Sequence, residues 1–180
     1  MTDNIETERL LLRPFAETDL EAFFNCCRNP VLGNNAGWKS HETMKESRDI
    51  LHQVFMEQEN IWAMVRKEDM KLIGSLGLVP DPKRENPYAL MLGYWLDEAA
   101  WGKGYMTEAV KAVLRFGFVK LNADIITASC YPHNERSRNV LIKQGFEYEG
   151  TLCQAELVCD GRILDHQCYC LKKEGWERLA

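Results

Sequence analysis

Hydrophobic and polar positions along the chain follow two periods, one typical of strands and one typical of helices. Strand-like stretches cover residues 8–15, 61–67, 71–79, 88–96 and 124–131. Residues 146–171 are typical of a final hairpin around Asp160-Gly161, a dipeptide that favours a type I′ turn. Helix-like stretches cover residues 18–28, 41–58, 105–121 and 135–144. The pattern predicts one α/β (α+β) domain over residues 1–180, with a mixed, mostly antiparallel sheet of about seven strands and four helices.

Capping residues indicate where these helices begin and end. Thr18 and Glu21 have the spacing of a capping box, which predicts that the first helix starts there. Ser40 precedes the second helix, Gly145 follows the last one, and residues 33–38 (GNNAGW) between the first two helices predict a loop. The predicted buried face of the second helix contains Met44, Leu51, Val54 and Phe55.

Composition and charge narrow the classes of protein. The seven cysteines include no CxxC pair and share no zinc-ligand spacing with the four histidines, so we expect free thiols in a reducing compartment and no metal site. The formal net charge of −5 argues against a nucleic-acid partner. No apolar run has the length of a membrane span, and the N-terminal segment lacks the pattern of a signal peptide. A cytoplasmic protein without a membrane partner is expected.

Residues 95–109, WLDEAAWGKGYMTEA, join a strand to a helix through two glycines. The N-terminus of a helix presents N–H donors and a partial positive charge, which together attract a phosphate. Gly102 and Gly104 remove side chains where the backbone would approach the phosphate, and Lys103 either adds charge or lies in solvent.

Two common phosphate motifs match this junction poorly. A P-loop needs glycine and Ser/Thr where this chain has Asp97 and Gly104. The dinucleotide fingerprint GxGxxG has its first two glycines here, but its third position is Thr107. Asp124 does lie at the distance where that fingerprint needs an acidic residue, so the dinucleotide interpretation stays open as an alternative.

Four stretches, in order and over nearly the whole chain, resemble the GNAT acyltransferase superfamily and most closely its ribosomal-protein N-terminal acetyltransferase branch. They are ERLLLRPF, LGYWLDEAAWGKGYMTEA, NERSRNVLIKQGFEYEGT and QAELVCDGRILDHQCYCL. The resemblance implies a GNAT-type twisted sheet with a splayed pair of central strands, residues 90–96 and 124–131, and an acetyl-CoA pantetheine arm lying between them like an added strand. Ala99 departs from the family, which usually has Gln or Arg there. The implied acetyl-CoA contacts are Trp95, Leu96, Trp101, Gly102, Lys103, Gly104, Tyr105, Met106, Thr107, Asn134 and Ser137.

The resemblance also implies the catalytic groups. Many GNAT enzymes protonate the departing thiolate with a tyrosine, and that position is Leu141 here. The nearest branch instead has a serine three positions after Asn134, which is Ser137, and a glutamate in a QAE context, which is Glu156. Ser137 would donate to the sulfur, Glu156 would accept the amine proton through water, and backbone N–H groups around residues 95–96 would stabilise the oxyanion. Each side chain also has an ordinary interpretation, as a helix cap (Asn134), a helix-surface serine or a solvent-facing strand residue.

The implied reaction is acetyl transfer to a primary amine by direct attack in a ternary complex. At pH 7 roughly 10–15% of an α-amine with a pKa near 7.7–8.0 is neutral, against about 0.04% of a lysine, which favours a protein or peptide N-terminus. Two alternatives stay open: acetylation of a small-molecule amine such as a polyamine or an antibiotic, and a non-catalytic acyl-CoA-binding module. Trp38 and Glu42 are expected to border the acceptor groove, and relatives suggest a homodimer.

Overall fold

The computed structural model describes residues 2–179, which form two compact units. The first unit comprises residues up to 77 together with 94–109, and the second comprises 78–93 together with 110–179. Eight strands are hydrogen-bonded in the order β1-β2-β3-β4-β5-β6-β8-β7. The predicted mixed, mostly antiparallel sheet is confirmed, with one parallel pair, β5 and β6. That residues 1–180 make a single domain stays a prediction.

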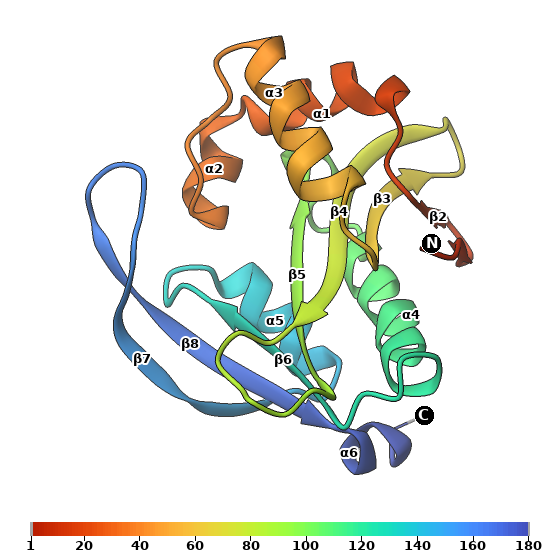
Figure 1. Cartoon of the computed structure of the whole chain (residues 1–180), viewed down its shortest axis with the longest axis vertical. Helices are drawn as coiled ribbons and strands as arrows, with labels where there is room; N and C mark the ends of the chain where they lie inside the picture. The colour runs from red at the N-terminus through yellow and green to blue at the C-terminus, as the bar shows by residue number, and fades with distance from the viewer. Residues whose placement is uncertain (1, 180) are drawn as a thin grey trace. The chain divides into compact units, whose positions relative to one another are not determined.

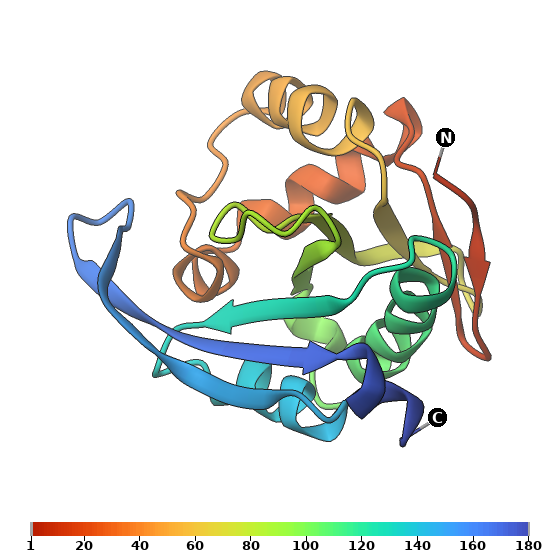
Figure 2. The same cartoon turned by 60° about the horizontal axis from the view of Figure 1, so that its bottom comes forward.

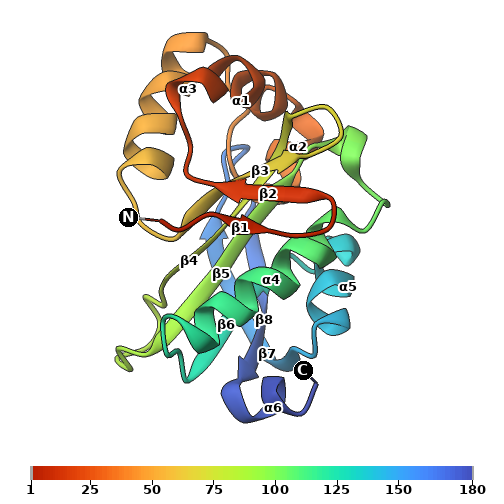
Figure 3. The same ribbon diagram turned by 90° about the vertical axis from the view of Figure 1, so that its right-hand side faces the viewer.

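The first unit contains short strands and most of the N-terminal helices. Figure 3 shows β1 and β2 as a short hairpin beside β3, with α1 and α3 at one end of these strands. The strands are β1 (Ile5–Glu6), β2 (Leu10–Arg13), β3 (Ile61–Arg66), most of β4 (Lys71–Pro80) and the end of β5 (Ala89–Leu96). The helices are α1 (Leu20–Cys27), α2 (Pro30–Ala36) and α3 (Met44–Ile50), which continues as the π-helical segment η2 (Leu51–Met56).

The second unit is built around a long hairpin of β7 (Glu147–Leu157) and β8 (Ile163–Lys172), shown in Figure 1. Figure 2 shows β6, β8 and β7 side by side, with α5 along one face. Gly161 has φ 85° whereas Asp160 does not have a positive φ, so the hairpin turn is not the predicted type I′ turn. The other elements are α4 (Tyr105–Val119), which starts in the first unit, β6 (Ile125–Cys130), α5 (Glu135–Lys143) and α6 (Lys173–Glu177).

The described residues contain eight strands and six α-helices, one strand and two helices more than predicted. β1 has two residues and α6 five, too few to show a period. α2 contradicts the predicted loop at 33–38. Asn29 accepts a hydrogen bond from the N–H of Val31 (2.9 Å), Pro30 occupies the first helical position, and Gly37 ends the helix with φ 83°. This cap-and-proline signal starts a helix despite weak periodicity.

Two predicted helix starts are wrong because residues other than the predicted ones cap these helices. The capping box at Thr18 is not formed, because the Asp19 carboxylate accepts from the N–H of Ala16 (2.9 Å) and from Arg13 (2.7 Å). Residues 17–19 are therefore 3₁₀-helical, and α1 begins one residue later. In α3 the cap is Thr43 in place of Ser40, and its hydroxyl accepts from a backbone N–H at 3.1 Å.

The buried face of the second predicted helix also differs from the pattern. Ser47 and Leu51 are fully buried, whereas Met44 and Val54 are exposed. The chain turns π-helical from residue 51, which adds residues to the turn and moves Val54 away from the face that a regular helix would bury. The helix predicted over residues 105–121 does bury one regular face, which contains Val110, Val113, Leu114 and Phe118.

β6 pairs with its two neighbouring strands over different lengths. It pairs with β8 along all six residues, from Ile125 to Cys130, but pairs with β5 only from Ile125 to Thr127. Within residues 2–179, Leu92 and Gly93 continue β5 without a paired residue in β6. The pairing therefore agrees with the predicted splayed pair of central strands.

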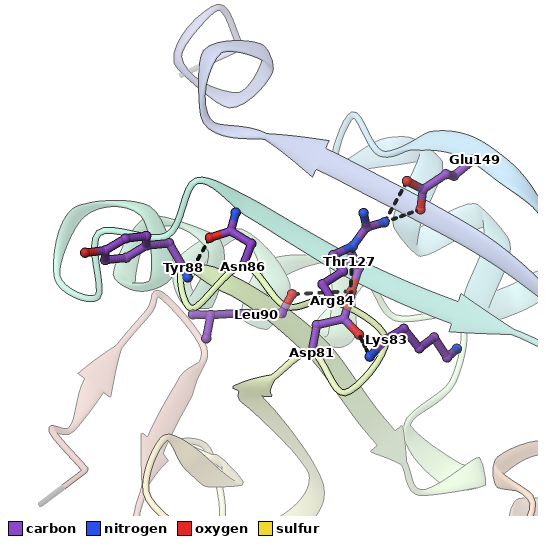
Figure 4. A network of polar contacts seen from close by, with 8 residues as sticks. All are labelled: Asp81, Lys83, Arg84, Asn86, Tyr88, Leu90, Thr127 and Glu149. Carbon is purple, nitrogen blue, oxygen red and sulfur yellow. Dashed lines mark hydrogen bonds and ion pairs between the residues drawn. The ribbon is translucent and has the colours of Figure 1, made fainter.

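A polar network holds the last paired residue of this segment. Thr127, opposite Met91, donates its hydroxyl hydrogen to the buried carboxylate of Asp81 at 2.8 Å. Arg84 binds the same carboxylate at 3.1 Å and reaches both oxygens of Glu149 at 2.6 Å (Figure 4). The hydrogen bonds to Glu149, with help from Asp81, raise the pKa of Arg84. The network thus ties the β4–β5 loop to β6 where the parallel pairing ends.

We expect Thr127→Val to destabilise the protein, because valine keeps the shape but leaves a buried carboxylate without one donor. The free energy of unfolding in urea should fall by about 1–3 kcal/mol. Thr127→Ser keeps the hydroxyl and loses one methyl, so it should cost about 1 kcal/mol or less. A valine variant as stable as wild type would show that the network does not stabilise this part of the sheet.

Candidate functional site

The turn between β5 and α4 has the backbone conformation of an anion site. After the 3₁₀ turn at Glu98–Ala100, Trp101 is extended, and Gly102 and Gly104 have φ values of 74° and 79°. The N–H of Glu108 donates to the carbonyl of Gly104 at 3.1 Å, and the first three residues of α4 precede this bond. Their N–H groups and the dipole of a 15-residue helix favour an anion at this point.

Little of the protein lies beside the two glycines. A Cβ atom at Gly102 would have no heavy atom within 4 Å, and one at Gly104 would lie 3.5 Å from Arg9 Nη2. Both glycines are therefore required by their left-handed backbone and not by close packing against the protein. The backbone of the turn is exposed at residues 102–104.

An arginine and a glutamate brace this turn, and neither was a predicted site residue. Arg9 donates to the carbonyl of Lys103 (2.9 Å) and to the carboxylate of Glu108 (2.7 Å), and its guanidinium lies 4.5 Å from the ring centre of Tyr105. Glu108 also accepts from the Thr7 hydroxyl at 2.6 Å. The stretch ERLLLRPF contains Arg9, but its contact with residues about one hundred positions away depends on the fold.

The other predicted residues of the turn contact its own backbone or lie in the interior. Trp101 Nε1 donates to the carbonyl of Leu96 at 2.8 Å, and Lys103 Nζ donates to the carbonyl of Ala99 at 2.9 Å. Lys103 is exposed, so its charge lies at the surface of the turn. Tyr105 and Met106 are buried, and Thr107 is half-buried.

The two predicted acceptor residues, Trp38 and Glu42, both belong to the first unit but have different surroundings. Trp38 packs edge-on against Trp95, with ring centres 6.3 Å apart, and Phe23 lies 6.0 Å from Trp95 on the same cluster. The indole N–H groups of Trp38 and Trp95 are buried without a hydrogen-bond partner among residues 2–179. Glu42 lies away in solvent, where it pairs with Lys39 at 2.7 Å.

Asn134 and Ser137 lie together at the start of α5 in the second unit. The Asn134 side chain accepts from the N–H of Ser137 at 3.1 Å, which confirms the helix-cap interpretation of Asn134. Both residues are half-buried. Leu141, where many GNAT enzymes have their tyrosine, is fully buried and serves the core.

Glu156 lies at a bulge that interrupts β7. Leu152 pairs with His166 and Glu156 pairs with Leu164, so three residues of β7 stand opposite one residue of β8. Gln154, in the middle, has φ 51°, and this left-handed residue breaks the alternation of faces. A regular strand would put Gln154 and Glu156 on the same face, and the bulge breaks this relation.

Two side chains that were not predicted contact Glu156. Its Oε2 atom accepts from the Tyr131 hydroxyl at 2.7 Å and lies 2.8 Å from His166 Nε2. Burial, followed by the neighbouring Glu156 charge, raises the pKa of Tyr131, so the phenol stays a neutral donor. Tyr131 follows β6 and His166 lies on β8, and strand alternation gives no signal for either contact because the bulge sets the register.

The chain matches the family model described as "Acetyltransferase (GNAT) domain" over residues 9–147. The chain belongs to the GNAT family. It is 29% identical to the uncharacterized N-acetyltransferase YoaA of Bacillus subtilis (strain 168) over 154 residues, which cover 83% of this chain and 86% of YoaA. It is 28% identical to the ribosomal-protein-serine acetyltransferase of Escherichia coli (strain K12) over 184 residues, with coverage of 93% and 100%. The crystal structure of the ribosomal-protein-S5-alanine acetyltransferase from Vibrio fischeri superposes with a TM-score of 0.74 at 25% identity, with coverage of 97% and 98%.

Membership in the GNAT family favours acetyl-CoA over a dinucleotide as the cofactor of this chain. The GNAT chain is an N-acetyltransferase, and acetyltransferases with this fold use acetyl-CoA. β5, α4 and β6 do form a parallel strand–helix–strand unit, the geometry that a dinucleotide fingerprint also needs. The family match and the Thr107 position together exclude the dinucleotide interpretation.

Other predicted features of the GNAT chain concern thiols, metals and membranes. All seven cysteines are free, and Cys153 and Cys159 are exposed. Burial raises the pKa of the Cys130 thiol to about 11. Across residues 2–179 no three His, Cys, Asp or Glu side chains are grouped to hold a metal ion. In the same part of the chain, no helix combines the length and apolarity needed to cross a membrane.

The brace at Glu108 should give stability that depends on pH. Burial raises the pKa of Glu108, but hydrogen bonds from Thr7 and Arg9 outweigh burial and the net shift is downward. A lowered pKa contributes stability above the unfolded value, about 4.3, and this stability disappears as pH falls through the folded value. Glu108→Gln should therefore cost about 1–3 kcal/mol at pH 7, and clearly less near pH 3, in urea denaturation.

The matched control is Glu68→Gln, which changes an exposed glutamate in the turn between β3 and β4. It should leave the free energy of unfolding unchanged at both pH values. A cost for Glu108→Gln that is the same at pH 7 and pH 3 would show that the charge of Glu108 does not stabilise the turn.

Proposed function

We propose that this GNAT enzyme transfers the acetyl group of acetyl-CoA to the N-terminal α-amine of a protein or peptide, by direct attack in a ternary complex. The observation that carries the proposal is the Gly102–Gly104 turn at the start of α4, where two left-handed glycines precede N–H donors and a positive helix end. The names of relatives that act on ribosomal proteins support this class of acceptor.

Each predicted site residue has a role in the proposed reaction. When bound, acetyl-CoA supplies the acetyl group as a thioester. The turn would hold the pyrophosphate, backbone N–H groups at Trp95 and Leu96 would meet the thioester carbonyl, and Asn134 would bind the pantetheine. The residues assigned to the pyrophosphate are Trp101, Gly102, Lys103, Gly104, Tyr105, Met106 and Thr107.

Two side chains would move the protons. As the acceptor nitrogen bonds to the acetyl carbon and the carbon–sulfur bond breaks, Glu156 would take, through water, the proton that leaves the nitrogen. The hydroxyl of Ser137 would donate its proton to the departing sulfur and take one back from solvent, so that the sulfur ends as a thiol and the serine is restored. The proton on Glu156 would then pass to solvent. The buried Leu141 supports this assignment, because it leaves no tyrosine at the usual position of the acid.

The α-amine is the acceptor that suits this set of groups. A carboxylate is a weak base, and an α-amine is neutral at pH 7 more than two orders of magnitude more often than a lysine, by about 10–15% to about 0.04%. Trp38, next to Trp95, and Glu42 on the segment before α3 are the proposed acceptor contacts.

Gly102→Ala should weaken coenzyme A binding. Alanine at φ 74° costs about 1–2 kcal/mol, so the turn is expected to relax and the dissociation constant in calorimetry to rise about tenfold. Gly161→Ala is the matched control, because Gly161 also has a left-handed φ (85°) and open space around it. The control should bind coenzyme A as wild type does. Equal affinities for wild type and Gly102→Ala would contradict binding at this turn.

Thiol release from acetyl-CoA should identify the acceptor class. Peptides that begin with Ala, Ser or Met are compared with polyamines and aminoglycosides, and we expect kcat/KM for at least one peptide to exceed that of the small amines about tenfold or more. Faster turnover of a polyamine or aminoglycoside would favour the small-molecule alternative. Coenzyme A binding without any thiol release would favour the non-catalytic module.

The same assay tests the proton-transfer residues. Replacing Ser137 and Glu156 together by Ala should lower kcat about 100-fold or more, the usual size of general acid–base catalysis. The free energy of unfolding is measured alongside, so that a folding defect is recognised. Unchanged turnover in a folded double variant would overturn the assigned roles.

A further inference from the structure

The carboxylate of Glu156 is held from one side only. Oε2 has two partners, the Tyr131 hydroxyl at 2.7 Å and His166 Nε2 at 2.8 Å. Among residues 2–179, Oε1 has no hydrogen-bond partner, and 39% of the side chain is exposed. One oxygen is therefore occupied, while the other is available to a ligand.

The chemistry of the three groups fixes the direction of both hydrogen bonds. An ionised carboxylate only accepts, so Tyr131 donates its O–H and His166 must carry a hydrogen on Nε2. The other ring nitrogen, His166 Nδ1, is buried and has no partner in the described part of the chain. The bond to Glu156 is thus the hydrogen bond that sets the tautomer of this imidazole.

The bulge in β7 makes this contact possible. In a regular ladder continued from the Leu152–His166 pair, Glu156 would stand opposite Arg162, four residues and about 13 Å along β8 from His166. The bulge places Glu156 opposite Leu164, two residues and about 7 Å from His166, within reach of its long side chain. The left-handed Gln154 is kept in place by a 2.7 Å bond from its N–H to Asp165.

The groups around the imidazole of His166 belong to two other segments of the chain. Glu156 comes from β7, whereas Tyr131 and His133 follow β6, and the rings of His133 and His166 each lie 5.5 Å from the ring of Tyr131. The His166 side chain is 17% exposed. Packing and one hydrogen bond therefore keep the imidazole beside the carboxylate.

We propose that Tyr131 and His166 are positioning residues, which hold Oε2 of Glu156 so that Oε1 receives the proton of the acceptor amine through water. The inference rests on the proposed role of Glu156. A half-exposed glutamate has three rotatable side-chain bonds, and two donors on one oxygen remove most of that freedom before the substrate binds. They also leave Oε2 with its lone pairs engaged, so the proton goes to Oε1.

Kinetics of four variants test the positioning role in the acetyl-CoA and peptide assay. His166→Ala and Tyr131→Phe should each lower kcat about tenfold, the value of one strong hydrogen bond, with KM for acetyl-CoA unchanged. His166→Gln, whose amide can donate near the Nε2 position, should recover kcat to within about threefold of wild type. Glu156→Gln should be slower than all three.

A second histidine–glutamate pair gives the matched control. His52 Nε2 lies 2.6 Å from Glu17 on the surface of the first unit, so His52→Ala breaks a similar pair elsewhere. This variant should keep the wild-type kcat. Thermal unfolding of every variant separates loss of the fold from loss of positioning.

The outcomes separate this inference from the proposed function. Wild-type turnover in Glu156→Gln would overturn the proposed function itself. A slow Glu156→Gln with wild-type rates for His166→Ala and Tyr131→Phe would overturn only the positioning role. If His166→Gln is as slow as His166→Ala and the acid limb of the pH profile disappears in both, His166 takes the proton itself and the positioning role is wrong.

Nitrogen NMR of the histidine rings supplies a readout that needs no acceptor. The neutral His166 ring should show a protonated Nε2 and an unprotonated Nδ1, and Glu156→Gln should change this preference. Hydrogen on Nδ1 in wild type, or signals that ignore the Glu156 substitution, would contradict the inferred hydrogen bond.

Discussion

The unequal hydrogen bonding of β6 is the constraint on which the second unit depends. Its backbone pairs with β8 over all six residues but with β5 over three. Asp81 and Thr127 hold the last pair beside β5, where the Thr127 hydroxyl satisfies a buried carboxylate. Beyond that point, among residues 2–179, no residue of β5 is paired with β6. Backbone groups on that side of β6 need another partner or solvent. In the proposed function, an amide-containing pantetheine arm is that partner.

The glycine turn depends on a different constraint, the left-handed backbone at two positions before a helix. Left-handed glycines aim successive N–H groups into one concavity, as a diphosphate requires. Arg9 and Glu108 keep this loop in one conformation, since they join its carbonyl and the first turn of α4 to the loop between β1 and β2. The turn is thus set before a ligand binds, which lowers the entropy cost of binding.

The surroundings of Glu156 show how a strand irregularity can serve a site. A regular β7 would place this glutamate too far along the hairpin to reach His166, and the bulge removes that separation. The site then combines an exposed carboxylate oxygen with one that is bound on the protein side. In the proposed function this arrangement suits a proton acceptor, because the oxygen that takes the proton has a fixed direction and remains exposed.

Local patterns in the sequence were sufficient for α4, the β3–β4 hairpin, the Asn134 cap and the two turn glycines, because each is determined by sterics and hydrogen bonds within a few residues. The periodicity did not predict α2, although the cap Asn29 and the following Pro30 are local signals for the start of a helix. The tertiary structure decided the remaining features. These are the π-helical turn after α3, the bulge at Gln154, and the contacts of Arg9 with Glu108 and of Tyr131 and His166 with Glu156. These features join residues from 10 to 99 positions apart or adapt a segment to its neighbours, and no periodicity along the chain records such a requirement.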